Sequence, residues 1–279
     1  FQAEDGIRDC LLSRGLGDVY KRQNNGITIK ARDWVTAGMK GVINGDEYVA
    51  VDLEMLKKMI DDDEDLSKVV TTLVTDMSGL FSGDVDFNEN ISSWHTVSVT
   101  TMEDMFRGAS AFNQDLSKWD TSGVLNMQQT FYNAIAFTNN LNDWDVSSVT
   151  DMDGMFRGAT SFNQPLNSWT VSKVTNFGQM FMDNDKFNQP LDNWNVSSAT
   201  NISSMFRGCR EFDQPLNAWN TSPSSTAKIT NMATVFLNAR KFNQPLDNWD
   251  VSKVTRMDDM FYNAFVFNGN IDNWNVSSV

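Results

Sequence analysis

The sequence is poor in the residues that most often carry chemistry. It has one histidine, His95, and two cysteines, Cys10 and Cys209, among 279 residues. A catalytic triad needs a histidine that a second side chain orients, and the sequence offers no such partner for His95. Zinc sites and disulfide frameworks need cysteines in paired spacings, which are missing here. We therefore expect no enzyme of the nucleophilic type, no metal and no cofactor.

Positive charge and long apolar runs are also scarce. The formal net charge is −14, which argues against a nucleic acid or an anionic membrane surface as partner. No run of 18 or more apolar residues occurs, so the given sequence predicts no membrane insertion. The hydrophobic fraction of 41% is nevertheless large enough for a substantial core.

The first residues resemble foreign sequence. Residues 3–23 are similar to a translated sequencing adaptor, and the chain begins with Phe1 rather than methionine. We expect residues 1–23 to be non-native and to take no part in the fold. We also expect the sequence to be a fragment truncated at both ends, with any signal or anchor outside it.

One eight-residue phrase recurs along the chain. The letters FNQPLDNW stand at residues 187–194 and again at 242–249. The phenylalanine that opens this phrase or its variants recurs every 25 residues with one step of 30, at Phe87, Phe112, Phe137, Phe162, Phe187, Phe212, Phe242 and Phe267. This period predicts stacked units that share one core. Residues 71–279 then hold seven full repeats and a half repeat at each end, with an inserted loop at residues 221–230.

The second half of each unit has helical spacing. Met152, Met155, Phe156 and Ala159 fall at i, i+3, i+4 and i+7, which predicts an amphipathic helix of about two turns. A threonine ahead of this stripe, as at Thr150, is expected to cap the helix, and an Arg-Gly pair is expected to end it.

The first half of each unit alternates instead. Trp144 and Val146 alternate with polar residues, which predicts a short strand. Together the halves predict an α/β repeat solenoid, a leucine-rich-repeat-like coil with one short parallel strand and one short helix per unit of about 25 residues.

The repeated pattern F-N-Q-x-L-x-x-W-x-V-S-x-V-T-x-M-x-x-M-F resembles a known family. It is similar to the 25-residue surface repeats of mycoplasma lipoproteins and to the allied BspA-like leucine-rich repeats. The resemblance implies a cell-surface or secreted protein that binds proteins or mediates attachment. It covers residues 74–279.

Residues 24–70 do not follow the repeat. Alternating apolar residues around Asn44-Gly45 predict a β-hairpin, and residues 53–60 predict a short amphipathic helix. We expect these elements to form a cap on the open first coil, with a separate domain or a linker as the alternative. The acidic run at residues 61–65 lacks the spacing of a calcium loop, so we expect a solvated helix end.

The outward residues beside each tryptophan are the candidate binding site. We expect His95 to be exposed there and Cys209 to be a buried thiol. Short polar residues dominate, and they would form a flat, acidic face for a protein or glycan. The site residues are expected to be Asp120, Asp143, Asp145, Asn193, Asn195, Asn248 and Asp250. An alternative is that these residues serve only tight stacking of the coils.

These patterns together favour a non-enzymatic binding or adhesion module at the cell surface or in secretions. A purely structural surface array is the first alternative, and a hydrolase with an acidic site is a distant third. The expected partner is a protein or glycan at a cell surface, and the expected state is a monomer.

Overall fold

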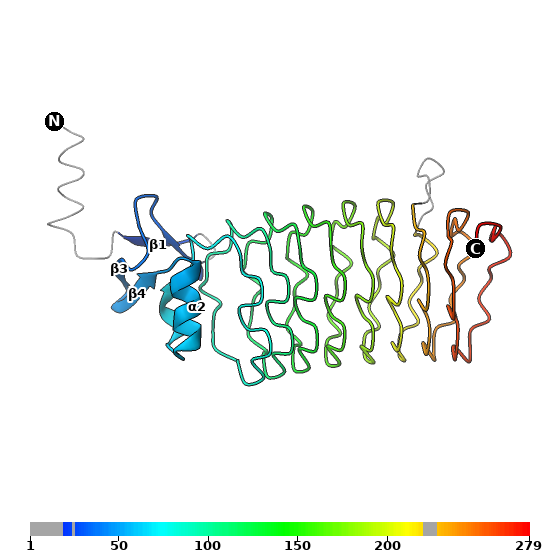
Figure 1. Cartoon of the computed structure of the whole chain (residues 1–279), viewed down its shortest axis with the longest axis horizontal. Helices are drawn as coiled ribbons and strands as arrows, with labels where there is room; N and C mark the ends of the chain where they lie inside the picture. The colour runs from blue at the N-terminus through cyan, green and yellow to red at the C-terminus, as the bar shows by residue number, and fades with distance from the viewer. Residues whose placement is uncertain (1–18, 24–25, 220–227) are drawn as a thin grey trace, which may run out of the picture.

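The computed structural model describes residues 19–23, 26–219 and 228–279. A small N-terminal unit with short strands and one helix lies at one end of a long stack of coils, and the C-terminus lies at the other end (Figure 1). The predicted loop at residues 221–230 falls mostly outside the described residues.

Two small sheets build the N-terminal unit. In one, β1 (Tyr20–Arg22) pairs antiparallel with β2 (Ile29–Ala31). In the other, β4 (Asp46–Ala50) pairs antiparallel with β3 (Lys40–Ile43) and parallel with β5 (Val69–Val70).

The hairpin between β3 and β4 turns at Asn44 and Gly45, where the sequence predicts one. Both residues have positive φ, at 55° and 92°, which the two-residue turn requires and which asparagine and glycine adopt most readily. Helix α2 (Leu53–Asp61) follows, close to the predicted residues 53–60. The Asp52 carboxylate accepts the Met55 N–H at 2.9 Å and so caps its N-terminus. The short 3-10 helix η2 (Leu66–Lys68) leads into β5.

The expectation that residues 1–23 take no part in the fold needs correction. Residues 1–18 lie outside the described residues, but strand β1 pairs with β2 and the Tyr20 side chain is 2% exposed. Tyr20 packs in a small core with Ile29, Val35 and Tyr48, and its hydroxyl donates to the Met39 carbonyl. Alternating apolar residues on a short strand are enough to produce this packing, whatever the source of the segment.

The N-terminal unit is joined to the first coils by hydrogen bonds and packing. The Ile29 N–H donates to the Ser93 carbonyl at 2.9 Å, and the Trp94 indole N–H donates to the Leu66 carbonyl at 3.1 Å. Leu56 and Met59 of α2 belong to the same apolar core as the coils. Helix α2 therefore covers apolar side chains at this end of the stack.

The coils are held in a parallel register. Single β-bridges join equivalent residues of successive coils along one line: Asp76, Thr101, Asn126, Asp151, Asn176, Asn201, Asn231 and Arg256. Every step is 25 residues except the 30-residue step from Asn201 to Asn231. The repeat period read from the sequence is thus the length of one turn of the stack (Figure 1).

The helix predicted in each unit is absent from the described part of the stack. Residues 152–159 form consecutive tight turns instead, with Met155 N–H donating to Met152 and Ala159 N–H donating to Phe156. Every second N–H group in these turns forms its hydrogen bond with a carbonyl of the next coil, not with its own coil. In one coil these donors are Met102, Asp104, Phe106 and Gly108, at 2.6–3.0 Å. A helix would keep those N–H groups within its own segment.

The residues expected to end the helix have a different role. Gly158 has a φ of +67°, and Asn133 in the preceding coil has a φ of +54° at the same position. Glycine and asparagine adopt this left-handed conformation with little strain, so they mark the tight turn rather than a helix stop. The expected threonine cap is also wrong, because the Thr150 hydroxyl donates to the Leu125 carbonyl of the preceding coil at 3.2 Å.

The strand predicted around the tryptophans is displaced. Trp144 and Val146 lie outside the bridged positions, and the ladder of bridges runs instead through Asp151 and its equivalents in the other coils. The apolar alternation at Trp144 and Val146 still reflects burial, because both side chains are no more than 3% exposed.

Three columns of aromatic rings fill the core. The rings of Phe106 and Phe131 stack at 5.4 Å, those of Phe112 and Phe137 at 6.0 Å, and those of Trp194 and Trp219 at 6.3 Å. Each buried indole N–H also donates to a leucine or isoleucine carbonyl of the preceding coil at 2.8–3.3 Å. The buried tryptophan is therefore fully satisfied.

The asparagine of the FNQ phrase forms a ladder on the outside of this core. Asn188 Oδ1 accepts both the Asp213 N–H and the Gln214 side-chain amide at 3.0 Å, and the Asn188 N–H donates to Asn163. Asn113 and Asn243 accept from the next coil in the same way. The recurrence of F, N, Q and W thus follows from packing and hydrogen bonding between neighbouring coils.

Candidate binding surface

The structure places all seven predicted site residues on the surface. The seven exposed residues are Asp120, Asp143, Asp145, Asn193, Asn195, Asn248 and Asp250. Asp120 and Asp145 hold equivalent positions of two adjacent coils, where the Thr121 hydroxyl donates to the Asp145 carbonyl at 2.9 Å, and Asp143 lies two residues before Asp145. The pair at 193 and 195 and the pair at 248 and 250 lie on other coils farther along the stack.

Where the residue after the tryptophan is aspartate or asparagine, it also has a structural role. The Asp145 carboxylate accepts the Ser147 N–H at 2.9 Å, and Asp250 accepts the Ser252 N–H at 3.0 Å. Asn195 makes the same contact with Ser197 at 3.1 Å. These are Asx turns, in which a short polar side chain fixes the next turn of the backbone.

The same hydrogen bonds affect the charge of this surface. Hydrogen bonds from Ser147 hold the pKa of Asp145 below its usual value, and bonds from Ser252 do the same for the pKa of Asp250. Both carboxylates are thus ionised at neutral pH, and the predicted face is a shallow acidic one.

The residue before the tryptophan is anchored through its backbone in two coils. The Asn193 N–H donates to Asn167 Oδ1 at 3.0 Å, and the Asn248 N–H donates to Asn217 Oδ1 at 2.9 Å. In another coil the Ser168 hydroxyl instead donates to Asn142, so the anchoring contact and the side chain both differ between coils. Successive coils carry Lys118, Asp143, Ser168, Asn193, Ala218 and Asn248 here.

His95 is not the exposed residue that the sequence predicts. It is 6% exposed, because it lies in the first coils beside the N-terminal unit, where its backbone N–H donates to the Thr71 hydroxyl at 2.9 Å. Burial and the nearby Lys30 cation lower the pKa of its imidazole, although Asp120 opposes them. A neutral, buried ring without an orienting carboxylate among its hydrogen-bond partners is unsuited to proton transfer.

Cys209 is fully buried, as predicted, and its thiol donates to the Phe181 carbonyl at 2.9 Å. Burial raises the pKa of this thiol well above its usual value. The side chain therefore behaves as a small core residue.

Sequence reasoning missed Asp153, a half-buried carboxyl in the turn segment. Burial raises its pKa to about 6, the neighbouring Asp151 carboxylate adds to this effect, and Arg157 opposes it. The space for this side chain comes from Gly178 in the next coil, where an added Cβ would lie 2.4 Å from Asp153 Oδ1. Only the coil register reveals this pairing of an aspartate with a glycine 25 residues later.

Sequence reasoning also missed two arginines that stack on one tyrosine ring. The Arg107 and Arg157 guanidinium groups lie over the ring of Tyr132, at 5.2 and 5.0 Å from its centroid. The three residues occupy equivalent positions of three successive coils. The 25-residue period, applied to these positions, could have found the row.

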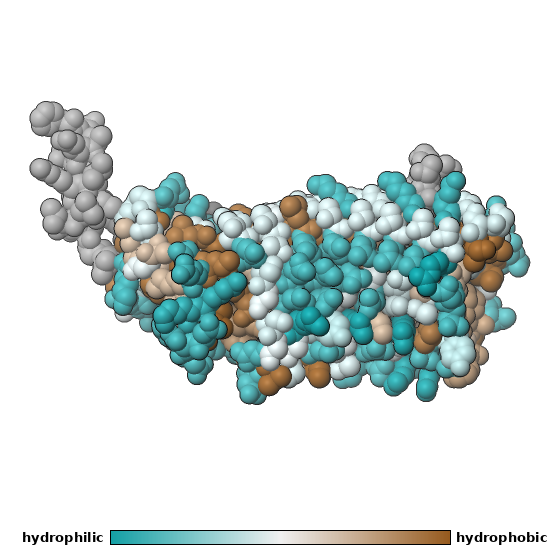
Figure 2. All heavy atoms as spheres, viewed as in Figure 1, coloured by the Kyte–Doolittle hydropathy of each residue, from teal (hydrophilic) through white to brown (hydrophobic). Residues whose placement is uncertain are grey.

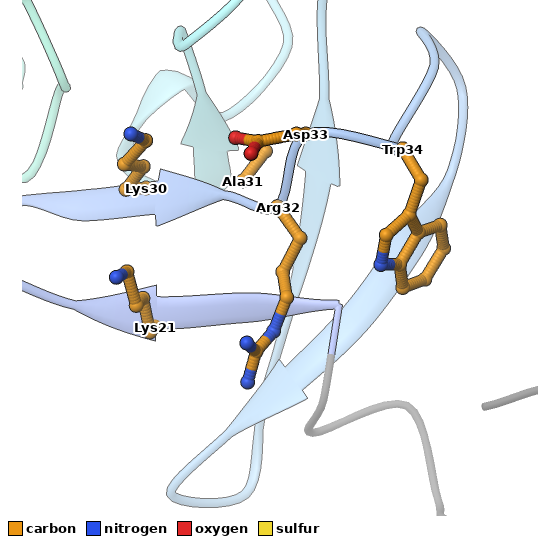
Figure 3. Close-up of a pocket in the computed structure, with 6 residues that line it drawn as sticks. All are labelled: Lys21, Lys30, Ala31, Arg32, Asp33 and Trp34. Atoms are coloured by element: carbon orange, nitrogen blue, oxygen red, sulfur yellow. The ribbon is translucent and has the colours of Figure 1, made fainter. Parts of the chain in front are cut away.

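A surface pocket of about 380 Å³ lies in the N-terminal unit (Figure 3). Lys21, Lys30 and Arg32 give it a cationic lining, together with Ala31, Asp33 and Trp34. Lys21 belongs to the stretch expected to be foreign, and Asp33 is the one carboxylate in the lining. The pocket therefore brings together neither a nucleophile and its base nor a set of metal ligands. Among the described residues, no cluster of three or more histidine, cysteine or acidic side chains could hold a metal ion.

Most of the chain matches one protein family. Residues 52–159, 136–227 and 222–279 match the family described as Mycoplasma protein of unknown function, DUF285. The chain belongs to this family. The match confirms the resemblance to mycoplasma-type repeats, while the finer BspA-like assignment stays a prediction. No curated protein and no solved structure matches the chain.

The DUF285 match begins at Asp52, the residue that caps α2, and continues through the coils. Strands β1 to β4 precede the matched region, whereas β5 lies inside it. In the described part of this DUF285 chain, none of the helices is long and apolar enough to cross a lipid bilayer. Hydrophilic residues cover much of the central coils on the face shown in Figure 2.

Proposed function

We propose that this DUF285 chain is a non-enzymatic binding or adhesion module, displayed at a cell surface or secreted. The proposal includes a BspA-like, leucine-rich-repeat type of solenoid. Parallel bridges and a buried apolar ladder support this class, whereas turns in place of helices set the chain apart from the helical form of the repeat.

One observation carries the proposal: the recurring tryptophans are buried, whereas the exposed residues directly before them vary between coils. Trp119, Trp144 and Trp169 are at most 4% exposed, while the side chains directly before them are Lys118, Asp143 and Ser168. A rigid array that holds variable side chains at fixed spacing is a suitable surface for recognising a macromolecule.

A structural array is the second candidate, and the Asx turns favour it. Asp145 and Asp250 accept hydrogen bonds from serine N–H groups. This structural role explains the presence of a carboxylate at these positions without a ligand. The two candidates differ in whether the charge of these carboxylates matters or only their hydrogen bonding.

Asparagine substitution separates charge from hydrogen bonding. Asn195 already makes the Asx turn in its own coil, so Asp120→Asn, Asp143→Asn, Asp145→Asn and Asp250→Asn together should keep the turns and remove four charges. The matched control removes four exposed charges away from the tryptophan-flanking residues, through Asp61→Asn, Asp63→Asn, Glu64→Gln and Asp86→Asn.

The measurement is binding of the labelled chain to an array of neutral and amino-sugar glycans and extracellular matrix proteins. We expect the first variant to lose affinity for a captured partner and the control to keep it, with unchanged melting in both. Equal affinity of both variants would move the site away from the tryptophan-flanking residues. Absence of capture by the parent chain would favour the structural array.

A further inference from the structure

The arginines of the stack are gathered at one corner of the coils. Five of the six arginines between residues 71 and 279 occupy positions equivalent to residues 107–111 of their coil, and two lysines join them. We call this set the arginine corner: Arg107, Arg157, Lys186, Arg207, Arg210, Arg240 and Lys241. Such a concentration of cations is unexpected in a chain with a net charge of −14.

The first part of the arginine corner is pre-organised. The Tyr132 ring lies between the guanidinium groups of Arg107 and Arg157, and Gln179 Oε1 accepts a hydrogen bond from Arg157. Cation–π contacts and a neutral acceptor fix the position of a guanidinium without neutralising its charge. Less side-chain entropy is then lost when an anion binds.

Part of the charge at this corner has no carboxylate partner. Asp104 pairs with Arg107 at 3.7 Å, Asp185 pairs with Arg210 at 3.0 Å, and Glu211 pairs with Lys241. Within the described residues, no ion pair involves Arg157 or Arg207. These two arginines remain available for an external anion.

The spacing of the arginines selects the shape of that anion. Arg107 and Arg157 lie on opposite faces of one ring, so their guanidinium carbons are at most about 10 Å apart. Arg207 continues the row after the same interval of two coils, because Phe156, Phe181 and Phe206 beneath it keep stacking at 5.8 Å. A row of cations along a straight edge fits a linear polymer with regularly spaced charges.

Two common polyanions fit this spacing poorly. Same-face side chains of an extended acidic peptide lie about 7 Å apart. Stacked nucleic acid carries a charge every 3.4 Å or so along each strand. An extended polysaccharide with one acidic group in every second sugar repeats its charge over two sugar rings, a distance that approaches the arginine spacing.

We propose that the arginine corner binds a linear acidic polysaccharide, with Arg107, Arg157 and Arg207 each contacting a carboxylate or sulfate of successive disaccharides. Arginine suits these groups because its planar fork donates two parallel hydrogen bonds to one oxyanion. This surface is separate from the tryptophan-flanking residues of the proposed function. A negative result for one surface therefore leaves the proposal for the other unaffected.

The test compares two variants of the full chain that lose equal charge. Arg107→Gln, Arg157→Gln and Arg207→Gln remove the row, whereas Lys57→Gln, Lys173→Gln and Lys253→Gln remove three exposed cations from outside the corner. Affinity is measured for hyaluronan and chondroitin sulfate, with poly-glutamate and a single-stranded DNA oligonucleotide as other polyanions. Circular dichroism and thermal melting report whether each variant folds.

We expect the parent chain and the lysine variant to bind a polysaccharide with similar affinity, and the arginine variant to bind it about tenfold more weakly or worse. Binding should also weaken as salt rises. If the triple arginine variant does not fold, the single Arg207→Gln variant should still show weakened binding, because Arg207 makes no side-chain ion pair that its loss would break.

Three results would overturn the proposal. The first is that neither polysaccharide binds the parent chain. The second is equal weakening by the arginine and lysine variants, which would indicate a general charge effect. The third is tighter binding of poly-glutamate or DNA than of either polysaccharide, which would assign the row to a peptide or a nucleic acid.

Discussion

Trp194 gives the strictest test of how the coils are stabilised. Its side chain is 2% exposed and stacks between Trp169 at 6.4 Å and Trp219 at 6.3 Å. Its indole N–H donates to the Leu166 carbonyl at 2.9 Å. Phe177 and Phe181 also contact its ring, at 5.6 and 6.4 Å between centroids. Trp194→Ala therefore removes four ring contacts, one buried hydrogen bond and the filling of a core position.

The expected cost is large and comes mainly from the cavity. Truncation of a buried tryptophan to alanine costs about 3–5 kcal/mol of unfolding free energy in total, of which ring contacts supply part, at about 0.5–1.5 kcal/mol each. We expect a loss at the upper end of this range, about 5 kcal/mol, for Trp194→Ala, because four ring contacts and the hydrogen bond are lost. Trp274→Ala is the matched control, because Trp274 is only partly buried and stacks on one tryptophan, Trp249 at 6.5 Å. Its loss should be about 1–2 kcal/mol, which reflects the smaller buried area.

Urea unfolding followed by tryptophan fluorescence measures both losses, and amide hydrogen exchange shows where the stack opens. Coils couple to their nearest neighbours, so exchange in Trp194→Ala should increase most in the coils on either side of residue 194. A loss for Trp194→Ala no larger than that for Trp274→Ala would refute the account of a core built from stacked rings.

Two further predictions concern charge and the N-terminal segment. The folded pKa of Asp153 is raised from 3.8 to about 6, so its neutral form is favoured in the folded state and stability falls as the pH rises between those values. Asp153→Asn should therefore raise the melting temperature at pH 7 and flatten its dependence between pH 4 and 6; an unchanged pH profile would contradict the burial of this carboxyl. Deletion of residues 1–18 should leave melting unchanged, whereas deletion of residues 1–23 removes β1 and buried Tyr20 and should destabilise the N-terminal unit. Equal melting of the two truncated chains would show that β1 contributes nothing to stability.

Several local elements could be predicted from the sequence because short-range chemistry decides them. The turn at Asn44-Gly45 follows from the ease with which these residues adopt positive φ, and α2 follows from its apolar spacing and Asp52 cap. The exposed positions beside Trp144 were also predictable, since a buried indole forces its chain neighbours outward.

The candidate surface was only partly predictable. The tryptophan-flanking carboxylates follow from alternation along the chain, but the hydrogen bonds that occupy Asp145 and Asp250 depend on the turn geometry. The Arg107–Tyr132–Arg157 row joins residues 25 positions apart, so it can be seen only when the coils are placed in register.

By itself the sequence determined the 25-residue period and the burial of the apolar residues that recur with it, because a position that is apolar in every coil faces the shared core. The tertiary structure alone decided the backbone path between those buried positions. The spacing of Met152, Met155, Phe156 and Ala159 suits a helix and a chain of tight turns equally well. The choice depends on where the N–H groups find acceptors, and here the carbonyls of the next coil accept them. That partner exists only once the coils are stacked, so no local segment contains the information.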